Sequence, residues 1–434
     1  MNIIGNITEE GKKNKTSFVL LLVLIITILL LFFEEPITRL GLSFVTLFRN
    51  FLPIMAAIVF IFHAIQNSAY WKKLLSPYFI CGSVFAISGI IGWIPNNYQT
   101  FSITAQTMYE HLRFWLCLYL FMEVFRLLPM EKYAKTFFFP IAILSTGIVL
   151  CCAADMIFYI WPRQMFRYGT SSLQLFMGHP SNLAAHVIFL IAMLCMLFPY
   201  LKAQTGVKSF FCISSLILSF LMLGCVFMTL RVRLFGFIAF FFVLYIYMIL
   251  FKKRLNLPII LVGIAGAAAV GWRRFYDFYF SPYAYTMARG QFAINSLDIA
   301  KNNFPFGSGF GTFGSRMAQL HYSPLYYKYK MVDTLGMSPD HPAYACDTFF
   351  PCILAESGWL GLVAYCGMIL TLFIYILQSQ KKNARSLITY YAIFTALILL
   401  AYELLETTGT LAFSETYSVL IAIPFALALL KCRE

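Results

Sequence analysis

Residues 183–201 read LAAHVIFLIAMLCMLFPYL, a run of nineteen residues without a charged side chain. An α-helix of this length and composition crosses roughly 30 Å of hydrocarbon. Similar runs recur along the chain, and 61% of its 434 residues are hydrophobic whereas only 12% are charged. An ordinary soluble domain carries about 25% charged residues. The composition therefore excludes a soluble enzyme, a disordered chain and a secreted disulfide scaffold, and it predicts an all-α polytopic membrane protein.

Twelve apolar runs are long enough to be transmembrane helices. They lie at 17–33, 46–65, 76–94, 112–128, 137–157, 183–201, 209–229, 234–251, 257–272, 358–378, 386–404 and 412–430. The first run follows a lysine-rich stretch and has no small-residue cleavage site, so we expect a retained helix. The chain then divides into spans one to nine (1–272), a long loop (273–357) and spans ten to twelve (358–434).

The loop 273–357 is far longer than the other connections. Loops of more than about 15 residues are usually functional or disordered. Hydrophobic residues at helical spacing predict an ordered helical cap here, between spans nine and ten. Its aromatic side chains have two interpretations, because they could contact sugars or pack the core of the loop. They are Tyr322, Tyr326, Tyr327, Tyr329, Phe349 and Phe350.

The net charge of +14 follows the predicted topology. With the N-terminus in the cytoplasm, eighteen of the 32 lysines and arginines fall on the cytoplasmic side, and fourteen of these are lysines. This distribution obeys the positive-inside rule, so both termini are expected in the cytoplasm and the charge indicates no nucleic-acid partner. On the outer side eleven of the fourteen basic residues are arginines. Arginine binds phosphate and carboxylate groups with a planar fork, which favours an anionic ligand there.

Two outer clusters precede spans six and eight. The first contains Arg163, Arg167, His179 and Asn182, and the second is Arg231-Val232-Arg233. Two arginines in so tight a hairpin lie at or below the membrane interface, where a charge is costly and indicates function. The alternative is that these arginines reach out to phospholipid head groups.

Two further clusters open and close the long loop. Arg289 precedes the glycine-rich run around Gly309, and His341 precedes Asp347. A short glycine run either approaches a phosphate with its backbone or forms a plain turn. A histidine and a carboxylate at the membrane boundary suit general acid–base catalysis, or they are merely solvated polar residues. The eleven cysteines lie mostly in apolar runs without metal-ligand spacing, so no metal site or cofactor is expected.

Taken together and in this order, the four outer clusters resemble the O-antigen ligase and polymerase superfamily of bacterial envelope proteins. The matching segments are Arg167 and Gly169 with Gly178-His179-Pro180-Ser181-Asn182-Leu183-Ala184, then Arg231 or Arg233, then Arg289 and Phe292 with Pro305-Phe306-Gly307-Ser308-Gly309-Phe310-Gly311, and last Asp347-Thr348 with Gly358-Trp359-Leu360-Gly361. Aspartate and threonine stand where the ligase pattern has a histidine followed by an amide or serine. The resemblance covers most of residues 160–378.

This resemblance implies a GT-C-like glycosyltransferase architecture in the bacterial inner membrane, with the active site on the periplasmic side. The donor would be an oligosaccharide carried on undecaprenyl diphosphate, and glycosyl transfer would be independent of metal. The implied roles are as follows. Asp347, His341 and Arg289 are catalytic; Arg163, Arg167, Arg231 and Arg233 bind the diphosphate; and His179, Asn182 and Gly309 bind substrate.

Three functions remain open at this point. The resemblance, without the ligase histidine, favours a polymerase that joins lipid-linked repeat units into O-antigen or capsular polysaccharide. A ligase that transfers the glycan to lipid A–core is the alternative. A transporter of lipid-linked sugars is less favoured, because no inverted repeat or pair of broken helices is visible in the sequence.

Overall fold

The computed structural model describes residues 2–66, 76–163, 166–383 and 386–432. The chain is mostly α-helical, and the described residues include one two-stranded antiparallel ribbon, β1 (Phe166–Arg167) with β2 (Thr170–Ser171). In this ribbon Phe166 pairs with Ser171 and Arg167 pairs with Thr170. The predicted all-α class is therefore confirmed.

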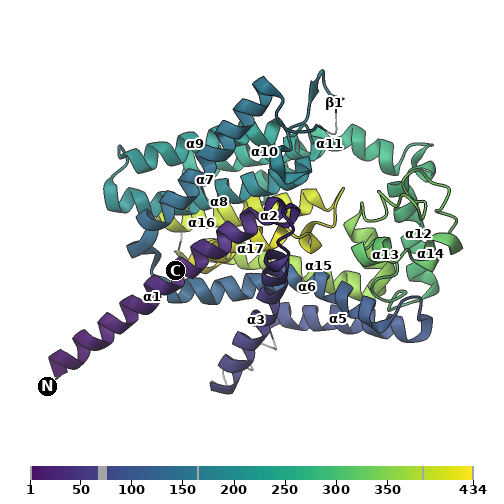
Figure 1. Cartoon of the computed structure of the whole chain (residues 1–434), viewed down its shortest axis with the longest axis horizontal. Coiled ribbons are helices and arrows are strands. Elements are labelled where there is room, and N and C mark those ends of the chain that lie inside the picture. The colour runs from purple at the N-terminus through teal and green to yellow at the C-terminus, as the bar shows by residue number, and fades with distance from the viewer. Residues whose placement is uncertain (1, 67–75, 164–165, 384–385, 433–434) are drawn as a thin grey trace.

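The helices run through the whole chain (Figure 1). The N-terminal part contains α1 (Asn2–Phe32), α2 (Glu34–Arg39), α3 (Phe44–Gln66), α5 (Pro77–Asn96), α6 (Phe101–Leu127) and α7 (Met130–Phe158). The central part contains the short η2 (Leu175–Met177), α8 (Pro180–Thr205), α9 (Phe210–Phe227), α10 (Val232–Leu244) with its π-helical extension η3 (Tyr245–Leu250), and α11 (Leu257–Tyr279). The C-terminal part contains η4 (Ala284–Thr286), α12 (Ala288–Asn302), α13 (Arg316–Leu320), α14 (Pro324–Lys328), α15 (Phe349–Asn383), α16 (Leu387–Glu406), η5 (Ala412–Ser414) and α17 (Ser418–Lys431).

Helix α8, which contains the run 183–201, lies at the centre of the bundle. Every residue from Leu183 to Leu201 is buried, and the neighbours are α7, α9, α16 and α17. A helix that is apolar on all sides must be covered by protein or lipid on all sides. Its N-terminus is fixed by Pro180 at the first helical position.

Among the described residues, nine helices are long and apolar enough to cross a membrane. They correspond to nine of the twelve predicted runs. The other three runs coincide with the apolar part of α1, with α6 and with α17. Helix α6 carries Glu110, Arg113, Glu123 and Arg126, and α1 and α17 contribute apolar segments at Thr16–Phe32 and Ser418–Lys431. Outer helices such as α3 and α11 expose most of their apolar side chains, as expected of a multi-pass membrane protein.

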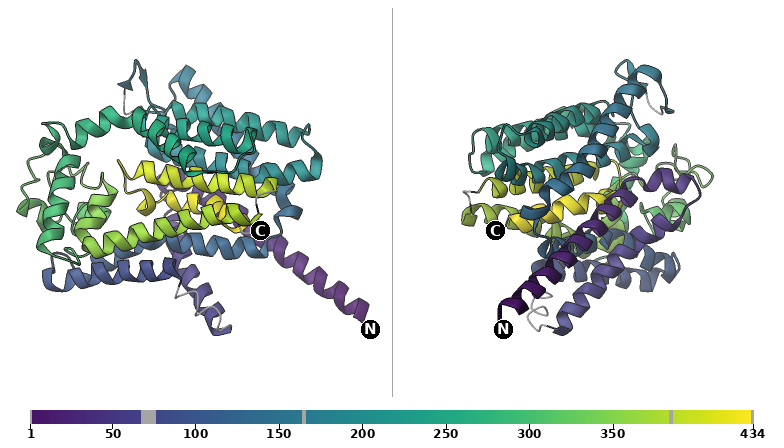
Figure 2. Two further views of the ribbon diagram at one scale, coloured as in Figure 1. Left: turned by 180° about the vertical axis from the view of Figure 1, so that it is seen from behind. Right: turned by 60° about the vertical axis from the view of Figure 1, so that its left-hand side comes forward.

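The predicted loop 273–357 is ordered and helical. Figures 1 and 2 show α12, α13 and α14 gathered at one end of the bundle, away from both chain termini. Phe292, Phe313 and Tyr326 pack with Met331 and Met337 in a small separate core. The Tyr326 hydroxyl accepts a hydrogen bond from the Gly314 backbone N–H and donates one to the Ala345 carbonyl. Tyr326 therefore packs the core of the loop.

A break in α15 attaches this loop to the bundle. Gly358 has φ 67° inside the helix, so the carbonyl oxygens of Ala355 and Glu356 are free of helical partners and accept hydrogen bonds from the backbone of Ser308 and Gly309, at 2.8 and 2.9 Å. The backbones approach so closely that a Cβ atom on Gly358 would lie 2.1 Å from the Pro305 carbonyl oxygen. Position 358 therefore requires glycine for both its conformation and its neighbours.

Replacing Gly358 by alanine is expected to lower Tm by more than about 5 °C, or to prevent folding, because the new methyl group separates the loop from α15. Gly147→Ala is the matched control, because a Cβ there meets nothing within 4 Å. Thermal unfolding in detergent compares the two variants. Equal Tm values would contradict the role given to this contact.

Candidate functional site

A cavity of about 1460 Å³ opens between the bundle and the loop helices. Its walls come from α1–α3, α6, the N-termini of α8, α10 and α12, the C-terminal half of α11, α13 and the connection 407–417 between α16 and α17. Pockets for ordinary small molecules measure roughly 300–1,000 Å³. This cavity therefore has room for an extended ligand or for two ligands side by side.

Arginines dominate the charge of the cavity. In the described part of the chain they are Arg49, Arg113, Arg167, Arg231, Arg233, Arg274, Arg289 and Arg316. Five carboxylates share the wall with these eight cations, namely Glu34, Glu35, Glu110, Asp347 and Glu415. The cavity therefore carries an excess of positive charge, which favours an anionic ligand.

The structure brings seven of the ten predicted site residues to this cavity. They are Asp347, Arg289, Arg231, Arg233, Arg167, His179 and Asn182. These residues come from segments that are up to 180 positions apart in the sequence. Residues from all four outer clusters therefore line one cavity, and three of the ten predicted residues do not line it.

The other three predicted residues lie elsewhere. Arg163 forms an ion pair with Asp155 at 3.3 Å and lies over the Tyr159 ring. Gly309 is buried against α5, where a Cβ atom would lie 2.6 Å from the Cα atom of Trp93. His341 is exposed in the turn that pairs it with Ser338. None of these three lines the cavity as described. The aromatic residues of the loop that were considered as sugar contacts are also absent from its described wall.

The tight turn between α9 and α10 positions Arg231 and Arg233. Leu230 adopts φ 54° and Arg231 is the N-cap of α10, so both arginines project at the start of the helix. The Arg231 Nη2 atom donates to Nε2 of His179 at 2.7 Å. Arg233 donates to Glu406 Oε1 and to Ser181 Oγ, both at 2.8 Å. The N-terminus of α8 therefore holds both guanidinium groups in place.

Arg289 and Asp347 form the second pair of the site. Arg289 lies in the first turn of α12, and its Nη2 atom is 3.0 Å from Oδ2 of Asp347. Its guanidinium carbon lies 4.6 Å from the centre of the Phe278 ring. Arg289 also meets Arg233 at Gly409, since a Cβ atom there would lie 2.1 Å from Arg233 Nη1 and 3.1 Å from Arg289 Nη2. The two arginines therefore converge over a position without a side chain.

Burial and mutual repulsion make it unfavourable to keep the neighbouring arginines of this cavity charged. Burial, with the charges of Arg233 and Arg167, lowers the pKa of Arg231 to about 10. Burial and the neighbouring Arg274 also lower the pKa of Arg167. These arginines remain protonated at neutral pH, but their charges repel one another. A bound anion would relieve this repulsion, which is the physical signature of an anion site.

The sequence did not point to several charged residues of the wall, among them Arg49, Glu110, Arg113, Arg274 and Arg316. Arg49 lies inside the predicted span 46–65, and an arginine within an apolar run could have been recognised as functional. Its side chain pairs with Glu34. Arg113 is buried on α6 and donates to the Ser414 carbonyl at 2.5 Å. Arg274 and Arg316 gave no signal, because the loop contains several other basic residues.

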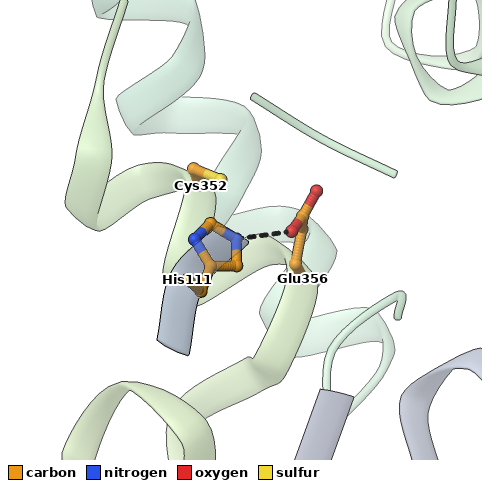
Figure 3. Close-up of side chains that lie close together, drawn as sticks. All are labelled: His111, Cys352 and Glu356. Atoms are coloured by element: carbon orange, nitrogen blue, oxygen red, sulfur yellow. Dashed lines mark hydrogen bonds and ion pairs between the residues drawn. The ribbon is translucent and has the colours of Figure 1, made fainter. Parts of the chain in front are cut away.

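A separate buried cluster contains His111, Cys352 and Glu356, whose ligand atoms lie within 4.8 Å of one another (Figure 3). These ligand types could hold a transition metal. The polar side-chain atoms of His111 and Glu356 already have hydrogen-bond partners within the protein. His111 contacts Glu356 Oε2 at 3.3 Å and Ser414 Oγ at 2.7 Å, and Glu356 Oε1 accepts from Ser315 Oγ at 2.6 Å and from the Phe313 backbone N–H at 3.0 Å. We therefore interpret the cluster as a hydrogen-bond network that joins α6, α15 and the loop.

No family model matches this sequence, and no curated protein matches it.

The first prediction for this region concerns the buried network. Glu356→Gln is expected to lower Tm by several degrees, because the charged acceptor of the Ser315 and Phe313 hydrogen bonds becomes a neutral amide oxygen and an NH2 group replaces Oε2 beside His111. Treating the wild-type protein with a strong chelator should leave its Tm unchanged. A chelator-induced fall in Tm, restored by zinc, would instead identify a metal site.

The second prediction concerns pH. Burial, with the charges of Arg231 and Arg233, lowers the pKa of His179 from 6.5 to about 4. The stabilisation from neutral His179 is therefore complete above pH 6.5 and is lost as the pH falls towards 4. His179→Gln should lose less Tm than the wild type between about pH 7 and pH 5. Identical pH dependence of Tm in the two proteins would contradict this.

Proposed function

We propose that this protein is a metal-independent glycosyltransferase that polymerises oligosaccharide repeat units carried on undecaprenyl diphosphate. It would cross the bacterial inner membrane twelve times, with α1, α6 and α17 added to the nine apolar helices, in a GT-C-like architecture. Both termini would be cytoplasmic, and the loop helices α12–α14 and the cavity would face the periplasm. The product would be O-antigen or capsular polysaccharide.

The observation that carries this proposal is the convergence of Arg167, Arg231, Arg233, Arg274 and Arg289 on one cavity. A diphosphate gains negative charge as the bond to the sugar breaks. Arginines fixed in advance stabilise that charge, and they do so through charge-assisted and bidentate hydrogen bonds. They supply the positive charge that a metal ion supplies in many other diphosphate sites.

Helix α11 supports a lipid-linked donor. Ala267, Ala268 and Gly271 line the cavity, while most apolar side chains of the same helix are exposed on the outside of the protein. A polyisoprenoid tail could therefore remain in the bilayer along α11 while its diphosphate enters between the arginines. The size of the cavity suits the diphosphate, the donor sugar and an acceptor chain together.

We propose for Asp347 a role other than the catalytic one expected from the sequence. Its carboxylate is paired with Arg289 at 3.0 Å. We propose that Asp347 orients the Arg289 guanidinium toward the diphosphate, with Gly409 leaving space for this group beside Arg233. Asn182 and His179, at the N-terminus of α8, complete the wall next to the arginines.

The test is polymerisation by the purified protein in lipid nanodiscs, with synthetic undecaprenyl diphosphate repeat units as the only substrate. A ladder of products that persists in chelator is expected. Product that forms only when lipid A–core is added would make the protein a ligase. Movement of the lipid across vesicle membranes without any new glycosidic bond would make it a transporter.

The adjacent arginines of α11 provide a matched pair of variants. Arg274 lines the cavity and Arg273 is exposed outside it. Arg274→Ala should lower the rate at least about 10-fold and Arg231→Ala about 100-fold, because each removes a charged donor from the diphosphate. Arg273→Ala should keep the wild-type rate. Equal effects of the Arg273 and Arg274 substitutions would contradict the proposed site.

A further inference from the structure

The five carboxylates of the cavity fall into two groups. Glu34 is paired with Arg49, Glu35 with Arg39 at 3.1 Å and Asp347 with Arg289 at 3.0 Å. No ion pair within the described residues includes Glu110 or Glu415. A carboxylate held by a guanidinium is a poor proton acceptor, because protonation costs the ion pair. Glu110 and Glu415 are therefore the carboxylates of this wall that are available to accept a proton.

Glu415 lines the same cavity as the arginines. It belongs to the same connection, 407–417, that places Gly409 between Arg233 and Arg289. The Leu411 backbone N–H donates to Oε1 of Glu415 at 3.3 Å. Its second oxygen, Oε2, accepts no hydrogen bond from the described residues. The turn therefore fixes the carboxylate and leaves one oxygen for a ligand.

Charged groups from several elements surround Glu415. Arg316 of α13 and Arg113 of α6 favour its ionised form, whereas burial and Glu406 of α16 oppose it. Burial is the largest of these effects and raises the pKa of Glu415. Tyr417, in the same connection, and Cys346 of the loop also line the cavity. Burial, with the charges of Glu415 and Asp347, raises the pKa of the Cys346 thiol to about 12.

The remaining wall differs in chemistry from the arginine cluster. Tyr109, Glu110, Arg113 and Arg316 mix aromatic, acidic and basic groups. Such a surface can donate hydrogen bonds to sugar hydroxyls, accept hydrogen bonds from them and stack on a sugar ring. Glu415 lies beside this wall, because the carbonyl of the neighbouring Ser414 accepts a hydrogen bond from Arg113. The cavity thus contains arginines for the diphosphate, a mixed wall for an uncharged sugar, and a carboxylate at that wall without an ion pair among the described residues.

We propose that Glu415 is the general base for the acceptor, whose terminal sugar binds the wall formed by Tyr109, Glu110, Arg113 and Arg316. This inference rests on the proposed function. Oε2 of Glu415 takes the proton of the attacking hydroxyl. The hydroxyl oxygen forms a bond to the anomeric carbon of the donor, and the bond from that carbon to the diphosphate oxygen breaks. The electron pair leaves with the lipid diphosphate, which the arginines hold, and the proton later passes from Glu415 to water.

The test compares Glu415→Gln, Glu415→Asp and Asp340→Asn in the polymerisation assay across a range of pH. Asp340 is an exposed carboxylate outside the cavity wall and is the control. Glu415→Gln should lower kcat about 100-fold or more and abolish the fall in rate on the acid side of the pH profile. Its binding of undecaprenyl diphosphate should stay at the wild-type level, which shows that the variant is folded. Glu415→Asp should keep part of the activity and the acid limb, and Asp340→Asn should match the wild type.

A Glu415→Gln variant with kcat within threefold of the wild type, or with the acid limb retained, would overturn the inference while the wild-type ladder leaves the proposed function intact. If the wild type forms no glycosidic bond, the proposed function and this inference both fail. If Glu415→Gln does not bind the lipid diphosphate, the Glu415→Asp variant is the test of the inference. A reduced kcat in Glu415→Asp supports the inference, and a kcat equal to that of the wild type would overturn it.

Discussion

The backbone contact between Gly307 and Gly358 determines where the loop meets the membrane bundle. A Cβ atom on Gly307 would lie 2.4 Å from the Gly358 backbone nitrogen. The two backbone segments are therefore in direct contact, without any side chain between them. Helix α12 ends just before this contact, and α15 begins nine residues before its break at Gly358. Arg289 at the start of α12 and Asp347 just before α15 are thereby held at one wall of the cavity.

The site destabilises the folded protein because the fold brings several positive charges close together. Arg231 and Arg233 are separated by one residue, and the loop adds Arg289 to them at Gly409. Glu406 and Asp347 neutralise Arg233 and Arg289, while Arg231 is bonded to the neutral His179. Uncompensated buried charge is destabilising unless a ligand supplies the counter-charge. Such a cavity is therefore best suited to a ligand that brings more than one negative charge, such as a diphosphate.

Much of this arrangement could be predicted from the local sequence. The apolar run 183–201 becomes the buried α8, and Arg231 and Arg233 reach the cavity because any tight turn between two apolar helices places them at its end. The remainder depends on partners distant in sequence. Gly309 packs against Trp93 of α5, and Arg163 forms an ion pair with Asp155. Gly409 belongs to the site because two arginines from other elements lie beside it. His341 lies only six residues before Asp347, yet the turn at Ser338 exposes it. Spacing in the sequence does not reveal such pairings, because they are fixed by how the helices pack.

In the proposed function the arginines of the cavity bind the diphosphate of a lipid carrier. An experimental structure of the protein in lipid nanodiscs with undecaprenyl diphosphate added tests this most directly. Diphosphate density is expected between Arg231, Arg233 and Arg289, with the polyisoprenoid tail along α11. Diphosphate density elsewhere on the protein, with this cavity filled only by water, would contradict it.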